Sequence, residues 1–88
     1  PFARVEVQRV LAAHRHALLR CLERGGVADP ITLRVAVRPD GRLVLTSADL
    51  PPGVSRHALG CLQRRVSRLS VRGRPERRVT VVHRIGTS

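Results

Sequence analysis

The sequence predicts an α+β fold, a two-layer sandwich in which two helices cover one face of a three-stranded, mostly antiparallel sheet. Two kinds of apolar spacing carry this prediction. Two long segments repeat apolar residues every three or four positions, as an amphipathic helix does, and three short segments alternate apolar with polar residues, as a half-buried strand does. In chain order they give α-β-β-α-β, and 88 residues are enough for one small domain, residues 1–88. Because the chain begins at Pro1 without a methionine, we expect it to be a segment of a longer protein.

The first helix is predicted from Val5 to Arg24, a stretch that contains neither proline nor glycine. Three-four spacing places one set of residues on a common face: Val7, Val10, Leu11, His14, Ala17, Leu18, Cys21 and Leu22. Gly25 and Gly26 come next. Glycine readily adopts the left-handed conformation that ends a helix, so we expect the helix to stop there.

The next two segments predict a β-hairpin. Ile31 to Arg38 alternates strictly, and Arg42 to Ser47 repeats the alternation. The Arg38-Pro39-Asp40-Gly41 segment between them is typical of a tight turn, because proline presets its own φ and glycine tolerates positive φ.

A second helix and a last strand complete the predicted layers. The helix is expected from Val54 to Leu69. Its inner face carries Val54, Ala58, Cys61, Leu62, Arg65 and Leu69, with Val66 beside them. The strand is expected from Arg78 to Ile85, with His83 among the apolar residues of its inner face and Val82 on the opposite face.

The charge is strongly positive. There are 17 basic residues against 6 acidic ones, a net charge of +11, and every basic residue is arginine. The arginines occur in every segment, which favours the codon usage of a GC-rich genome over a dedicated binding patch. Phe2 is the single aromatic residue, so the stacking platforms that often bind single-stranded nucleic acid are missing. An Arg-rich nucleic-acid-binding domain is therefore the alternative function, and a nucleic-acid partner is not our first expectation.

The two cysteines lie in two similar segments of the sequence, RHALLRCLER and RHALGCLQR. Only the Cys-Leu pair keeps the same helical register in both segments, because the preceding histidine is five residues before Cys21 but four before Cys61. Three interpretations remain open: a disulfide, two free buried thiols, or a metal held by both cysteines with His57. The disulfide is favoured, because closing a loop of this size stabilises a small domain by roughly 4 kcal/mol in the chain-entropy model.

No arrangement of residues points to catalysis. The six acidic residues are scattered, and no serine lies in a strand-to-helix elbow. A glycine-rich phosphate loop and paired metal-ligand motifs are also missing from the sequence. We therefore expect a protein that is not an enzyme, with no catalytic residue, no metal and no cofactor.

The assembled pattern resembles the C-terminal domain of the AgmX/PglI type, a branch of the TonB C-terminal superfamily. The similarity covers the chain from Val5 to Ile85, through RHALLRCLE, the hairpin ITLRVAVRPDG with RLVLTSADLPPGVS, the helix segment CLQRRVSRL and the strand VTVVHRI. Its most specific parts are the cysteine in each helix and Gly41 of the hairpin. The sequence departs from the family at Leu22, where a tyrosine is usual, and it lacks the family's aromatic-proline segment.

The resemblance implies a periplasmic domain of an inner-membrane-anchored protein, within a cell-envelope complex of the kind that serves transport or motility. It implies binding of an envelope protein or extended peptide by strand addition, in which a partner strand pairs with an exposed sheet edge. The expected edge is the last strand: Arg78, Val79, Thr80, Val81, Val82, His83, Arg84 and Ile85. Arg78 and Arg84 would attract an acidic peptide, although edge arginines also serve to prevent aggregation. A homodimer is an alternative assembly, and contact with a membrane is expected only through an upstream anchor or, in a third hypothesis, through anionic lipid headgroups.

Overall fold

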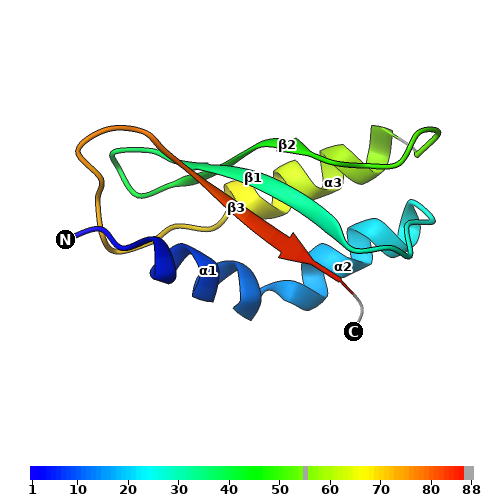
Figure 1. Ribbon diagram of the computed structural model, residues 1–88, viewed down its shortest axis with the longest axis horizontal. Coiled ribbons are helices and arrows are strands. Elements are labelled where there is room, and N and C mark those ends of the chain that lie inside the picture. Colours follow the sequence, from blue (N-terminus) through cyan, green and yellow to red (C-terminus); the bar gives the residue numbers. More distant parts are fainter. Residues whose placement is uncertain (55, 87–88) are drawn as a thin grey trace.

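The computed structural model describes residues 1–54 and 56–86, which form one antiparallel sheet with helices on a single face (Figure 1). The α+β class and the two-layer arrangement are confirmed. The elements are α1 (Arg4–Ala13), α2 (Arg15–Arg24), β1 (Ile31–Val37), β2 (Leu43–Ala48), α3 (Arg56–Ser67) and β3 (Val79–Ile85). The helical layer differs from the prediction in two respects. The first expected helix is two helices, and Val54 and Leu69, the predicted ends of the second helix, lie outside α3.

The break between α1 and α2 lies at His14, which has φ −103° and ψ 18°. The imidazole Nδ1 of His14 donates to the carbonyl of Val10 at 2.9 Å, so it competes with the backbone for that acceptor. A side chain that enters the hydrogen-bond ladder is a common cause of a helix kink. His14 was predicted on the inner face, and this is wrong, because the kink turns it to solvent while Leu19 becomes buried.

The end of α2 follows the prediction closely. Gly26 has φ 77°, the amide of Gly26 donates to the carbonyl of Glu23 at 3.0 Å, and the amide of Val27 donates to the carbonyl of Leu22 at 2.9 Å. These two hydrogen bonds form a Schellman motif, in which a glycine in the left-handed region satisfies the last carbonyls of a helix. The motif directs the chain from α2 back toward the sheet.

The sheet has the strand order β2-β1-β3, so the first strand in the sequence is the central one. The β1–β2 register runs from Val37 opposite Leu43 to Leu33 opposite Ala48, and one bulge at Thr46 interrupts it. The β1–β3 register is regular over its whole length, from Ile31 opposite Ile85 to Val37 opposite Val79. Both pairings are antiparallel, and β2 and β3 are therefore the two outer strands.

The hairpin turn forms where the sequence predicts it. The amide of Gly41 donates to the carbonyl of Arg38 at 2.8 Å, and Gly41 has φ 87°. A Cβ on Gly41 would lie 2.5 Å from the carbonyl oxygen of Val71, because residues 69–71 pass beside the start of β2. The amide of Leu43 donates to the carbonyl of Leu69 at 3.1 Å, so this segment also covers part of the outer edge of β2.

The core lies between the sheet and the helices. Its fully buried large side chains are Val7, Leu11, Leu18, Leu22, Leu33, Val35, Val37, Leu43, Leu62, Val66 and Ile85. The buried residues of α3 are Ala58, Leu62 and Val66, a spacing of four. Arg65, which was predicted on the inner face, is therefore exposed, because the buried stripe of α3 passes through Val66 instead.

A disulfide joins Cys21 of α2 to Cys61 of α3. The Cα atoms of the two cysteines are 5.5 Å apart, and Cys21 is buried. The close approach of the helices depends on Gly25, since a Cβ there would lie only 2.8 Å from the Cβ of Ala58. The favoured interpretation of the cysteines is confirmed, and the interpretations as free thiols or metal ligands are wrong because both sulfurs are in the bond.

Candidate functional site

The outer edge of β3 is the candidate site. In the part of the chain that the structure describes, β3 pairs with one strand, β1, so its other side is an edge of the sheet. Of the predicted site residues, Arg78 precedes the strand and the other seven form it. Val79, Val81, His83 and Ile85 alternate toward the helices, while Thr80, Val82 and Arg84 are exposed.

The directions of the main-chain groups follow from the hydrogen bonds. The carbonyl of Thr32 in β1 accepts from the amide of Asp49 on the β2 side, so the odd-numbered residues of β1 face β3. Odd-numbered residues of β1 lie opposite odd-numbered residues of β3. In an antiparallel pair both main-chain groups of a residue point to the same side. The N–H and C=O groups of Thr80, Val82 and Arg84 therefore point outward, away from the sheet.

Side chains of the helices already occupy part of this outward row. The guanidinium of Arg4 donates to the carbonyl of Thr80 at 2.7 Å, and the amide of Gln8 donates to the carbonyl of Val82 at 2.9 Å. Arg15, at the start of α2, donates to the carbonyl of Gly86 through Nε at 3.0 Å and also through Nη2. We call these donors, Arg4, Gln8 and Arg15, the edge caps.

The edge caps are positioned by contacts on both sides of α1. The carboxylate of Glu6 accepts from the amides of Arg72 at 2.7 Å and Gly73 at 3.4 Å, which attaches α1 to the segment before β3. On the other side, Nδ1 of His83 donates to Oε1 of Gln8. His83 is half-buried on the helix-facing side of β3, and this burial lowers the pKa of its imidazole.

The edge is basic and carries one large exposed apolar side chain. Arg78 lies at one end of the strand and Arg84 near the other, and both are exposed. Between them the side chain of Val82 is 57% exposed. An apolar residue flanked by positive charges suits an extended segment with acidic and apolar residues.

The outer edge of β2 is covered by main chain at its start and irregular beyond it, whereas the described residues cover the β3 edge only with side chains. Its first outward amide, that of Leu43, is already bonded to the carbonyl of Leu69, and Arg42 forms an isolated bridge with Ser70. The bulge at Thr46 then disturbs the regular spacing that a partner strand needs. Both features favour β3 as the pairing edge.

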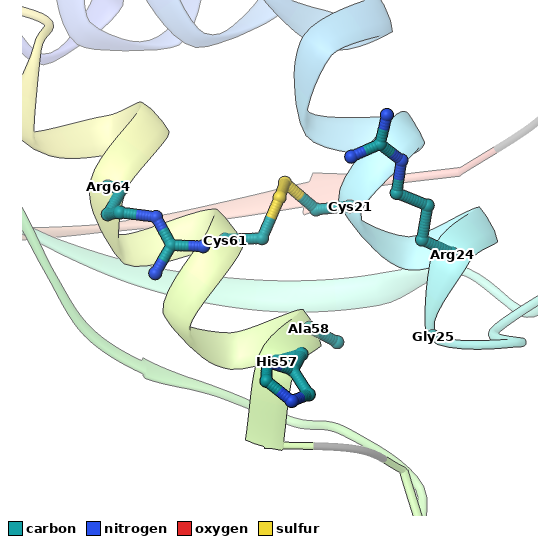
Figure 2. A pocket seen from close by; sticks show the side chains of 7 residues that line it. All are labelled: Cys21, Arg24, Gly25, His57, Ala58, Cys61 and Arg64. Carbon is teal, nitrogen blue, oxygen red and sulfur yellow. A yellow bond between two sulfur atoms is a disulfide. The ribbon is translucent and has the colours of Figure 1, made fainter.

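A pocket of about 320 Å³ lies between α2 and α3, beside the disulfide. Figure 2 shows the Cys21–Cys61 bond between the two helices, with Arg24 from α2 and Arg64 from α3 on either side of it. His57 and Ala58 of α3 also line the pocket. Within residues 1–54 and 56–86, no three or more of the His, Cys, Asp and Glu side chains are grouped so that they could hold a metal ion.

The sequence indicated the last strand as the site, but it did not indicate the edge caps. The available signal was a pair of polar donors four residues apart, Arg4 and Gln8, beside the buried positions Val7 and Leu11 of the same helix. Such a pair is common on any solvent-exposed helix, and only the packing of α1 against β3 brings these two side chains to the carbonyls of the edge.

The chain matches no family model, no curated protein and no solved structure. The resemblance to the AgmX/PglI-type domain therefore stays a prediction that rests on the residues alone. Over the described part of the chain, no helix is long and apolar enough to cross a membrane.

Proposed function

We propose that this domain is a non-enzymatic interaction module that binds an extended segment of a partner protein along the outer edge of β3. The observation that carries the proposal is the outward row of main-chain groups at Thr80, Val82 and Arg84, on a strand with one paired side. Strand addition uses such a row directly, since the partner's main chain supplies the matching hydrogen bonds. The alternate side chains of the added strand then set the specificity through their contacts with this chain.

The charge of the edge favours an acidic partner. The whole chain carries a net charge of +11, and Arg4, Arg78 and Arg84 all lie at or beside β3. Opposite charge raises the rate of encounter and helps to fix the register of the added strand. A positive edge also disfavours pairing of two copies of the chain, so we place a homodimer second.

The disulfide supports an oxidising compartment. Such bonds persist in secreted and periplasmic proteins and are rare in a reducing cytosol. Together with the resemblance described above, the Cys21–Cys61 bond supports a domain that works in the periplasm, in a complex with envelope proteins. Alkylation in denaturant of cells quenched with acid tests this location, because bonded cysteines then resist the reagent until a reductant is added, whereas reduced ones do not. Modification without reductant would contradict it.

The strand-addition proposal is tested with a synthetic peptide of about eight residues that alternates aspartate and valine, the length of an ordinary strand. Amide shifts are followed by NMR during the titration. The largest shifts are expected at Thr80, Val82 and Arg84, whose N–H groups point outward. Shifts confined to the helices would count against the proposal.

A proline variant separates main-chain pairing from a general attraction between charges. Thr80→Pro removes one outward N–H and no bond to β1, which an edge strand tolerates. Thr80→Ala is the matched comparison, because it removes the side chain but keeps the N–H. Loss of peptide binding in the proline variant alone supports strand addition, whereas equal binding by the two variants would refute it.

The net charge of +11 keeps nucleic-acid binding as the rival function. Titration with random-sequence DNA at several salt concentrations decides between the two. Tight binding with a steep salt dependence would favour the rival.

A further inference from the structure

The edge caps repeat with the spacing of the strand. Arg4 and Gln8 are four residues apart on α1, a distance of about 6 Å along a helix. The carbonyls that they bind, those of Thr80 and Val82, are two residues apart on β3, or about 6.8 Å along a strand. Because these distances nearly match, a helix that runs beside the strand places one donor on each successive outward carbonyl.

The series has a gap at Arg84. The next position in the same spacing is Ala12, which is exposed and has no donor, so α1 offers nothing to the carbonyl of Arg84. Beyond the kink, Arg15 resumes the series on Gly86. Among residues 1–54 and 56–86, side chains therefore cap the carbonyls of Thr80 and Val82 in β3 and of Gly86 just beyond it, and none caps the carbonyl of Arg84 between them.

We propose that the edge caps hold the β3 edge closed and that an acidic extended peptide opens it by exchange. The inference rests on the proposed function and concerns the regulation of the same site. The peptide first pairs at Arg84, the uncapped position. Its N–H groups then replace the amide of Gln8 on the carbonyl of Val82 and the guanidinium of Arg4 on the carbonyl of Thr80.

The exchange explains why the partner must be acidic. Each hydrogen bond lost by a carbonyl is replaced by one from the peptide main chain, so the carbonyls lose no partner. The released guanidinium of Arg4 needs a new acceptor, and a carboxylate of the peptide supplies it with a stronger, charge-assisted bond. A neutral peptide gives Arg4 only water in exchange. Without a partner, the same caps keep two copies of the chain from pairing edge to edge.

The experiment compares the chain with the double variant Arg4→Ala, Gln8→Ala. Two peptides are titrated, the alternating aspartate-valine peptide and its neutral analogue with asparagine. The double variant is expected to bind the neutral peptide on the order of tenfold more tightly than the unmodified chain, because two hydrogen bonds no longer have to be broken. Its preference for the acidic peptide over the neutral one is expected to shrink. Arg9→Ala, at an exposed arginine of the same helix, is the matched control and should change neither value.

Ala12→Gln gives a change of opposite sign. By the spacing of the series, its amide reaches the carbonyl of Arg84 and fills the gap, so binding of both peptides is expected to weaken by several fold. Because one variant tightens binding and the other weakens it, a general loss of folding cannot imitate the pair. A circular-dichroism unfolding curve for each variant checks that the fold is retained.

The outcomes separate this inference from the proposed function. If all variants bind with equal affinity and shift the amides of Thr80 and Val82, strand addition stands and the closing role of the edge caps is overturned. If neither the unmodified chain nor the double variant binds any peptide at β3, the proposed function fails and the edge caps have nothing to regulate. Tighter binding by the double variant together with weaker binding by Ala12→Gln supports both.

Discussion

Removal of the Cys21–Cys61 disulfide is expected to cost this domain much of its stability. The perturbation is the double variant Cys21→Ala, Cys61→Ala, which avoids the buried hydroxyl that serine would introduce at Cys21, a residue with 1% of its surface exposed. Alanine keeps the helices apolar where they meet. The change therefore isolates the covalent link, apart from the space that each sulfur leaves.

The magnitude follows from the loop that the bond closes. The cysteines are 40 residues apart, and in the chain-entropy model a loop of that length stabilises the folded state by about 4 kcal/mol at 25 °C. Loss of the buried sulfur of Cys21 adds up to about 1 kcal/mol. An 88-residue domain has a total unfolding free energy of roughly 4 to 13 kcal/mol, so the variant loses at least about 30% of it.

The assays are urea unfolding and thermal unfolding, both followed by circular dichroism, for the unmodified chain with and without reductant and for the double variant. The melting temperature should fall by about 16 to 40 °C, since each kcal/mol is worth about 4 to 8 °C in a domain of this size. The slope of the unfolding free energy against urea should rise in the variant, because its unfolded chain is less compact. Reductant should have no effect on the double variant, which serves as the control.

A loss of less than about 1 kcal/mol would refute the chain-entropy reasoning for this domain. So would identical masses of the purified chain before and after reduction, because a reduced bond gains two hydrogen atoms.

Two further outcomes are expected. Gly41→Ala and Gly53→Ala both place a side chain at positive φ, at a cost of about 1 to 2 kcal/mol each. Gly41→Ala should cost about 2 kcal/mol more than Gly53→Ala, because a Cβ at Gly41 would lie 2.5 Å from the carbonyl oxygen of Val71, whereas nothing lies within 4 Å of a Cβ at Gly53. Equal urea midpoints for the two variants would contradict this expectation. Burial lowers the pKa of His83 in the folded chain from its ordinary value of 6.5. Below about pH 6.5 the imidazole therefore takes up a proton more readily in the unfolded chain than in the folded chain. The stability that the neutral imidazole confers is lost as the pH falls from there through the folded pKa. His83→Gln should make the urea midpoint depend less on pH between about pH 7.5 and 5, and an unchanged dependence would rule out this role for the imidazole.

The parts of the fold that the sequence predicts well are set by local chemistry. The hairpin turn at Gly41 and the end of α2 at Gly26 each need a residue that tolerates positive φ, and glycine marks both places. The inner position of Cys21 follows from helical spacing in the same way. In each case neighbours in the chain decide the conformation.

The missed features depend on contacts between distant segments or on one competing hydrogen bond. Nothing in the period of Val5 to Arg24 signals that the helix breaks at His14, where the imidazole and the main-chain N–H both donate to the carbonyl of Val10. The exposure of Arg65 depends on how α3 packs against the sheet and α2, where Ala58, Leu62 and Val66 are the residues that become buried. The edge caps pair Arg4 and Gln8 with residues more than 70 positions away, a separation at which periodicity carries no information.

The disulfide also divides the molecule into a covalent ring and two tails. The ring runs from Cys21 to Cys61 and contains β1 and β2, while α1 and β3 lie outside it, one in each tail. The bond therefore limits how far the hairpin and its helices can separate, but it places no limit on α1 and β3, which only noncovalent contacts keep in place. Hydrogen exchange should accordingly be fastest in α1 and β3 under mild denaturant, so the part of the domain free to rearrange around a partner is the part that carries the candidate site.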